Sequence, residues 1–214
     1  MRLTAEGLAA ARGERPLFSG LGFALEPGDV LVLTGPNGSG KSSLLRLVAG
    51  FGRPTAGTIC WDGKPLHDDL ETYRAQIHYV GHQEALKPAL TVTETLRFWA
   101  DLAERPLRAP AGPLKALGLS QKAKTPCRFL SSGQRRRLAL SRLIAWEAPL
   151  WLLDEPTVGL DDEALSLVAR LIERHRAAGG IVLLSTHQPL PLAGAQFLSL
   201  ADFPPVRAVV TAEW

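Results

Sequence analysis

The segment GPNGSGKS at residues 35–42 constrains the fold of this chain more than any other part of its sequence. It directly follows an apolar run, VLVL at residues 30–33, and precedes a stretch whose pattern is typical of a helix. The glycines allow the backbone to turn tightly, so that several N–H groups point into one concave space where the helix begins. A strand, a glycine-rich loop and a helix in this order predict a site that binds phosphate groups.

The residues of this loop have separate tasks in binding a nucleoside triphosphate. Backbone N–H groups surround the α- and β-phosphates, while Lys41 bridges the β- and γ-phosphates. Ser42 offers a hydroxyl oxygen to Mg²⁺, a cation that prefers oxygen ligands and keeps most of its waters. The residues predicted to bind the nucleotide are Gly35, Pro36, Asn37, Gly38, Ser39, Gly40, Lys41, Ser42 and Ser43.

Length and composition limit the other possibilities. A chain of 214 residues is long enough for one α/β domain with a small insertion, but not for two full domains. A net charge of +3 is too small to predict nucleic-acid binding without a clustered basic patch. The two cysteines, Cys60 and Cys127, lack the spacing of metal or redox sites, so we expect free thiols in a reducing compartment.

Membrane-spanning and targeting segments are not expected. No stretch of 18 residues is both apolar and free of charges and prolines. The opening MRLTAEGLAA is interrupted by Glu6 and fits a strand better than a signal peptide. We therefore expect a cytoplasmic chain that reaches a membrane only through a partner.

Hydrophobic patterning predicts an α/β fold. Runs that are apolar throughout, such as 150–153 and 181–184, are typical of a parallel sheet covered by helices on both faces. Thr91 and Glu94 have the spacing of a helix capping box, and glycines at 179–180 are a plausible helix end. Strands are predicted at 2–5, 23–26, 30–34, 58–61, 77–80, 150–153, 181–185, 197–200 and 206–210, and helices at 41–50, 91–103, 132–146 and 161–178.

A change of pattern in the middle of the chain predicts its organisation. Between residues 84 and 146 the sequence becomes polar and helical, with several prolines interrupting it. Apolar strands flank this region on both sides. We therefore expect one domain, in which residues 1–83 and 147–214 form an α/β core and residues 84–146 form an inserted helical subdomain.

The segment PLWLLDEP at residues 149–156 is an apolar strand that ends in two acids. Asp154 at the strand end can hold Mg²⁺ through its water shell, and Glu155 is placed to orient and deprotonate an attacking water. Adjacent carboxylates can also simply begin a solvated loop. Together with a phosphate-binding loop, they predict hydrolysis of the nucleotide.

Two further motifs place polar groups where phosphates bind. In LSSGQRRRLALSRL, residues 130–143, Ser132 and Gly133 lie at a helix start, where N–H groups and the helix dipole favour a phosphate. Taken alone, the motif is a good helix cap, and its distance from the glycine-rich loop indicates a different nucleotide. His187 follows the apolar run IVLL, at the strand end that faces the ligand crevice in open α/β sheets.

These motifs, in this order, resemble the nucleotide-binding subunits of ATP-binding cassette (ABC) transporters over nearly the whole chain. The resemblance implies ATP as the nucleotide and a P-loop NTPase core with a mixed or parallel sheet, N-terminal antiparallel strands and an inserted helical subdomain. It implies that Lys41, Glu155 and His187 are the catalytic residues, with His187 contacting the γ-phosphate, and that Ser42 and Asp154 hold the metal.

The same resemblance implies a head-to-tail homodimer. The signature residues, Ser131, Ser132, Gly133 and Gln134, would contact the ATP of the partner, and the loop ending at Asp161 would cross the dimer interface. The family also carries basic residues just after its signature, so Arg135 to Arg137 do not require nucleic acid.

Two positions depart from the family pattern. Where the family has a glutamine after the strand at 77–80, this chain has His82, with Gln83 one residue later. Imidazole suits Mg²⁺ poorly, so His82 would bind water or phosphate, and Gln83 remains the alternative. The family stacks adenine on an aromatic residue before the loop; here Arg12 or Arg15 is the candidate, through its planar guanidinium.

Several segments resemble one branch of the family, the ATP-binding subunits of cytochrome c maturation systems. These are YVGHQ, WLLDEP, SSGQRRRLALSRL, GGIVLLSTHQPL and the opening ERPLFSGLGFALEPGD. The resemblance implies transmembrane permease subunits as partners, a peripheral position at the cytoplasmic face of the inner membrane, and support of haem delivery. Alternatives are a transporter for another cargo, a soluble ABC ATPase acting on ribosomes or DNA, and a non-catalytic nucleotide-gated module. Whether haem itself is moved or a haem-loaded chaperone is released stays open.

Overall fold

The structure is a computed structural model that describes residues 1–105, 107 and 109–205. It contains two sheets. The first is antiparallel, in the order β2-β1-β4-β5, and is formed by β1 (Leu3–Arg12), β2 (Arg15–Leu25), β4 (Ala56–Trp61) and β5 (Lys64–Pro65). The second is parallel, in the order β6-β7-β8-β3-β9, and is formed by β3 (Val30–Thr34), β6 (Ile77–Val80), β7 (Leu150–Asp154), β8 (Ile181–Ser185) and β9 (Gln196–Ser199).

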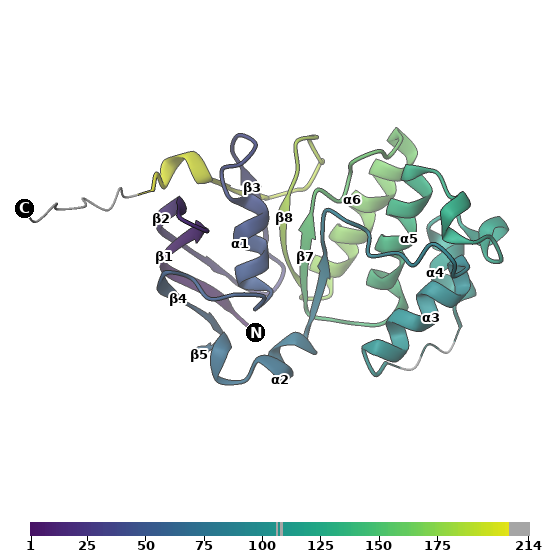
Figure 1. The fold of residues 1–214 in the computed structure, drawn as a ribbon, viewed down its shortest axis with the longest axis horizontal. Coiled ribbons are helices and arrows are strands. Elements are labelled where there is room, and N and C mark those ends of the chain that lie inside the picture. Colours follow the sequence, from purple (N-terminus) through teal and green to yellow (C-terminus); the bar gives the residue numbers. More distant parts are fainter. Residues whose placement is uncertain (106, 108, 206–214) are drawn as a thin grey trace, which may run out of the picture.

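The parallel sheet is buried on both faces, as its apolar strands predict. Leu152 and Leu183 point to one face, toward helix α1 (Lys41–Val48) and the antiparallel sheet. Trp151 and Val182 point to the other face, toward the remaining long helices. Figure 1 shows α1 between the two sheets and the helical part of the molecule on the far side of β7. Successive residues thus enter different cores, because side chains alternate along a strand.

The helical part consists of α3 (Val92–Leu102), α4 (Ala111–Ala116) and α5 (Ser132–Ala145), with α5 packed against both of the others. Helix α6 (Asp162–Ala177) covers the sheet beside it. Capping boxes begin α3 at Thr91 and α5 at Ser131. Short 3₁₀ helices lie at Leu66–Asp68, Ser120–Lys122, Cys127–Phe129 and Leu200–Asp202. The predicted fold class, with N-terminal antiparallel strands and an inserted helical subdomain, is confirmed.

The first two strands are longer than the sequence analysis predicted. They form a hairpin of 10 and 11 residues, in place of short strands at 2–5 and 23–26. Their pairing register shifts between Ala5 and Leu8, where Gly7 adopts a left-handed conformation with φ 59°. Such a bulge inserts a residue and breaks the alternation of apolar positions, so periodicity alone ends the strand too early.

Two short helices were missed, α4 and α2 (Leu70–Arg74). Each has fewer than two turns, so neither offers enough residues to reveal a helical period. The strand expected at 206–210 lies outside the described residues. Within the described part of the chain, none of the helices combines the length and the apolar character needed to cross a membrane.

Candidate functional site

The glycine-rich loop joins β3 to α1 at the carboxyl end of the parallel sheet. Gly40, immediately before α1, has φ 107°, and a side chain there would approach Phe18 to 3.0 Å. Only glycine fits this combination of backbone angle and close packing. The Lys41 side chain is buried, and its Nζ donates to the carbonyls of Gly35 at 2.7 Å and Pro36 at 3.1 Å. The loop is therefore folded around the lysine ammonium.

Ser42 and Asp154, the two residues predicted to hold a metal ion, lie in contact at the end of β7. The Ser42 hydroxyl donates to Oδ1 of Asp154 at 3.0 Å, although the two residues are 112 positions apart. Ser185, at the end of β8, donates to the same oxygen at 2.8 Å. A hydroxyl and a carboxylate are the oxygen donors that Mg²⁺ prefers, so this pair fits the implied ion.

Glu155 begins the turn after β7 in a left-handed backbone conformation, with φ 51°. Its backbone N–H donates to the hydroxyl and the carbonyl of Ser185, each at 3.1 Å. Its carboxylate faces His187: Oε1 lies 3.2 Å from Nε2, and Oε2 accepts the backbone N–H of His187 at 3.2 Å. The two predicted catalytic side chains therefore lie side by side.

A cavity of about 490 Å³ brings these groups together. Glu155 and His187 lie on its wall with the loop residues from Asn37 to Ser43 other than Ser39. Of the two candidates at the position of the family glutamine, His82 lines this cavity and Gln83 does not. Of the two candidates for stacking on adenine, Arg12 lines the cavity and Arg15 does not. Leu17 and Val158 complete the wall.

The signature residues lie away from this cavity. Ser131 caps α5: its hydroxyl accepts the N–H of Gln134 at 3.2 Å, and the Gln134 side chain accepts the N–H of Ser131 at 3.0 Å. Ser132 is exposed, while a side chain at Gly133 would lie 2.7 Å from the carbonyl of Gly159. Helix α5 therefore begins in contact with the loop that precedes α6.

Asp161, expected at a dimer interface, has a local role in the structure. It caps α6, where its Oδ1 accepts the N–H of Ala164 at 2.9 Å. This cap fixes the end of the loop that touches Gly133.

Sequence analysis missed two residues of the site, Ser185 and Arg136. Ser185 is a fully buried hydroxyl at the end of an apolar strand, and that contrast was the signal. The three arginines after the signature were treated as one basic cluster, but Arg136 is only 2% exposed. Its spacing of three, four and seven residues from Ala139, Leu140 and Leu143 places it on the buried face of α5.

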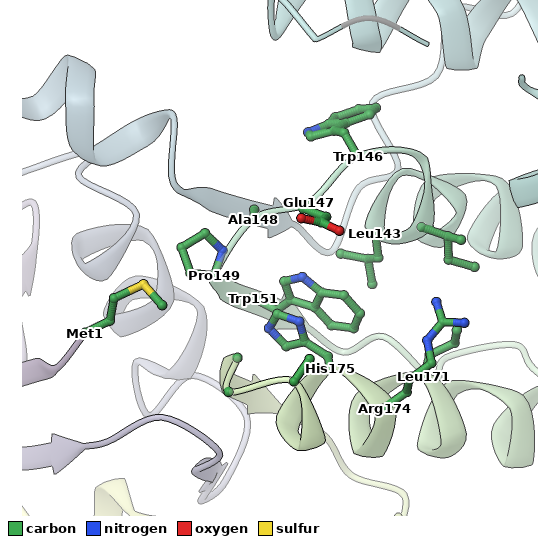
Figure 2. Close-up of a pocket in the computed structure, with 14 residues that line it drawn as sticks. Met1, Leu143, Trp146, Glu147, Ala148, Pro149, Trp151, Leu171, Arg174 and His175 are labelled. Atoms are coloured by element: carbon green, nitrogen blue, oxygen red, sulfur yellow. The ribbon is translucent and has the colours of Figure 1, made fainter. Parts of the chain in front are cut away.

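A second cavity, of about 550 Å³, lies at the opposite end of β7 and β8. In Figure 2 the His175 ring lies flat against Trp151, and Trp146 points away from this pair. The centroids of the two stacked rings are 3.9 Å apart. Gly180 beside them leaves no room for a side chain, because its Cβ would clash with the His175 ring. This end of the sheet is organised by aromatic packing, and Trp61 and Trp99 are likewise buried.

Comparison with known proteins identifies relatives over nearly the whole chain. The model of the family "ABC transporter" matches residues 18–158. "Cytochrome c biogenesis ATP-binding export protein CcmA" of Paramagnetospirillum magneticum is 50% identical over 204 residues, covering 94% of each chain. The protein of the same name from Rhodospirillum rubrum is 52% identical over 200 residues, covering 94% of this chain and 86% of that protein.

Solved structures share the fold. A "putative ABC transporter (ATP-binding protein)" from Pyrococcus furiosus superimposes with a TM-score of 0.82 at 22% identity, covering 95% of this chain and 99% of that one. A structure described as the ATP binding subunit of an ABC transporter gives a TM-score of 0.78 at 28% identity, covering 87% and 80%. The arrangement of the two sheets and the helical subdomain is therefore one that occurs in solved ATP-binding proteins.

Proposed function

Since the chain belongs to the ABC transporter family, we propose that it is the ATP-hydrolysing subunit of an ABC complex that serves cytochrome c biogenesis. The observation that carries this proposal is that three separate segments meet at one cavity: the phosphate loop, the end of β7 and the residues after β8. Ser42 contacts Asp154 there, and Glu155 contacts His187, all at the carboxyl end of the parallel sheet. This end of an open α/β sheet is where ligands bind.

In the proposed reaction, the loop N–H groups and Lys41 hold the phosphates of ATP. Ser42 and Asp154 would hold Mg²⁺, which neutralises charge on the β- and γ-phosphates when bound. Glu155 directs the attacking water at the γ-phosphate and accepts a proton from that water. His187 keeps the Glu155 carboxylate in place and contacts the γ-phosphate from its ring nitrogen. Arg12 stacks on adenine, and His82 contacts water or phosphate at the cavity wall.

A head-to-tail homodimer would complete each site. Ser132, Gly133 and Gln134 lie outside the cavity of their own chain, which supports their contacting the ATP of the partner. The loop between Gly159 and Asp161 would lie at the interface between the two copies. Exclusion of water by closure of the dimer strengthens the electrostatic interactions that stabilise phosphoryl transfer.

The membrane partner and the cargo rest on the relatives. Because those proteins are named as ATP-binding export proteins of cytochrome c biogenesis, we propose a permease of the cytochrome c maturation system as partner, with this chain at the cytoplasmic face of the inner membrane. The region from His82 to Thr91, where the core meets the helical subdomain, would make the contact. ATP hydrolysis by the complex would support haem delivery, either by moving haem or by releasing a haem-loaded chaperone.

The decisive experiment compares the wild-type chain with Glu155→Gln in its native membrane. Purified Glu155→Gln should bind ATP normally and hydrolyse it at least about 100-fold more slowly, since the base is gone. Cells that carry only this variant should lose haem-stained c-type cytochromes, and mass spectrometry of the captured wild-type chain should recover a multi-spanning subunit with cytochrome c maturation proteins. Normal cytochromes, or recovery of a different permease, would reject the proposed cargo while leaving the ATPase.

A further inference from the structure

Arg136 is a buried cation that touches three backbone carbonyls from two other parts of the chain. It lies on α5, two residues after Gln134, and is only 2% exposed. One guanidinium nitrogen donates to the carbonyl of Gly81 at 2.9 Å. The second terminal nitrogen, Nη2, donates to the carbonyls of Asp154 at 3.1 Å and Glu155 at 2.5 Å. A guanidinium offers its donors in a rigid fork, so these three carbonyls are held in a fixed relation.

The carbonyl of Asp154 belongs to the peptide group before the Glu155 Cα atom, and the carbonyl of Glu155 belongs to the peptide group after it. Holding both carbonyls restricts the rotation of the backbone at Glu155. That residue has φ 51°, a conformation in which a side chain crowds the backbone and which needs support from its surroundings. Ser185 supports it from one side, by accepting the N–H of Glu155, and Arg136 supports it from the other.

The third carbonyl extends this support to the strand on the other side of β7. Gly81 follows β6 and precedes His82, which lines the ATP cavity. Arg136 therefore joins the helix that carries the signature residues to the turn of the proposed base and to the segment of His82. The hydrogen bonds of the neighbouring arginines stay within the helical subdomain: Arg135 donates to the carbonyl of Leu130 at 2.8 Å, and Arg137 donates to that of Leu117, at the end of α4, at 3.4 Å.

We propose that Arg136 is a positioning residue for ATP hydrolysis, which holds the Glu155 backbone so that the carboxylate faces His187 and the γ-phosphate. It acts through Glu155 and touches no substrate. The inference rests on the proposed function, because it takes Glu155 as the base.

The test is a double-mutant comparison of ATP hydrolysis by the purified chain. Arg136→Lys keeps the charge but loses the fork that reaches three carbonyls. We expect its kcat to fall at least about 10-fold, with KM for ATP and the affinity for a fluorescent ATP analogue changed less than about 2-fold. Arg137→Lys is the matched control, since it makes the same change on the next residue and should keep kcat within about 2-fold.

The Glu155→Gln background separates positioning from other roles. A residue that acts only through Glu155 has little left to influence once the base is gone, so Arg136→Lys should lower the residual rate of Glu155→Gln less than about 2-fold. An equal loss in both backgrounds, or an unchanged kcat in Arg136→Lys alone, would overturn the inference. Normal hydrolysis by Glu155→Gln itself would instead overturn the proposed base.

Folding is monitored in the same experiment through ATP affinity and thermal unfolding. If Arg136→Lys does not fold, Arg136→Gln, whose planar amide retains two donors, takes its place. Loss of ATP binding together with hydrolysis in both variants would also overturn the inference, because it would leave Arg136 a purely structural role.

Discussion

At the scale of single residues, Ser185 connects the metal site to the turn of the proposed base. Its hydroxyl donates to Asp154 and accepts from the backbone N–H of Glu155. The side chain is fully buried, so bulk water cannot take the place of this hydroxyl as the hydrogen-bond partner of either group.

We expect Ser185→Ala to lower kcat for ATP about 10-fold and to raise the Mg²⁺ concentration needed for half-maximal activity. Removing the hydroxyl frees the Asp154 carboxylate to rotate and leaves the Glu155 N–H with only the carbonyl of residue 185 as acceptor. Steady-state rates over a Mg²⁺ titration measure both effects. Ser141→Ala, which removes another fully buried hydroxyl that bonds only within its own helix, is the control and should leave the Mg²⁺ dependence unchanged.

A second residue-scale prediction concerns pH. Burial lowers the pKa of His78 to about 4, partly opposed by its hydrogen bond with the carbonyl of Trp146. Unfolded histidine titrates near 6.5, so between these values the unfolded chain binds more protons than the folded one. The free energy of unfolding should therefore fall as pH falls from about 6.5 to 4, with His78 contributing up to about 3 kcal/mol.

Chemical denaturation at a series of pH values checks this prediction. His78→Phe keeps an aromatic ring against Trp146 but cannot titrate, so its stability should depend less on pH than that of the wild type. His175, whose pKa burial also lowers to about 4, should leave a residual dependence in that variant. An unchanged pH dependence in His78→Phe would show that His78 is not the group that titrates.

At the scale of elements, the two capping boxes of the helical subdomain give a matched pair of variants. Thr91 caps α3 and Ser131 caps α5, each by accepting an N–H from the third residue of its helix at 3.2 Å. Each alanine variant should lower the free energy of unfolding by about 1 kcal/mol. Only Ser131→Ala should also weaken ATP-dependent dimerisation and hydrolysis, since α5 begins with the signature. Equal hydrolysis by the two folded variants would argue against a role of that helix start in the ATP site.

At the scale of the whole molecule, dimerisation should depend on ATP and on the surface around Ser132. Glu155→Gln with ATP and Mg²⁺ should sediment as a dimer, because slow hydrolysis traps the closed state, and without ATP it should sediment as a monomer. Adding Ser132→Arg places a large side chain on an exposed position of the signature and should abolish the dimer while ATP affinity is retained. A persistent dimer in the double variant would place the interface elsewhere.

The sequence by itself determined the features that depend on neighbours along the chain. The phosphate loop between β3 and α1, the apolar runs of β7 and β8 and the cap of α3 each lie within a few consecutive residues. Local backbone geometry, hydrophobic periodicity and hydrogen bonds over three residues fix such features, so a short segment contains all the information.

Only the tertiary structure decided which distant residues share the site. The strand order β6-β7-β8-β3-β9 places β8 between β3 and β7, and this brings Ser42 to Asp154 and His187 to Glu155. It also decided which groups the buried Arg136 contacts, because the packing of α5 against the parallel sheet brings the carbonyls of Gly81 and Glu155 to its guanidinium. Such contacts depend on how sheets and helices pack, and packing is a property of the whole chain that no single segment contains.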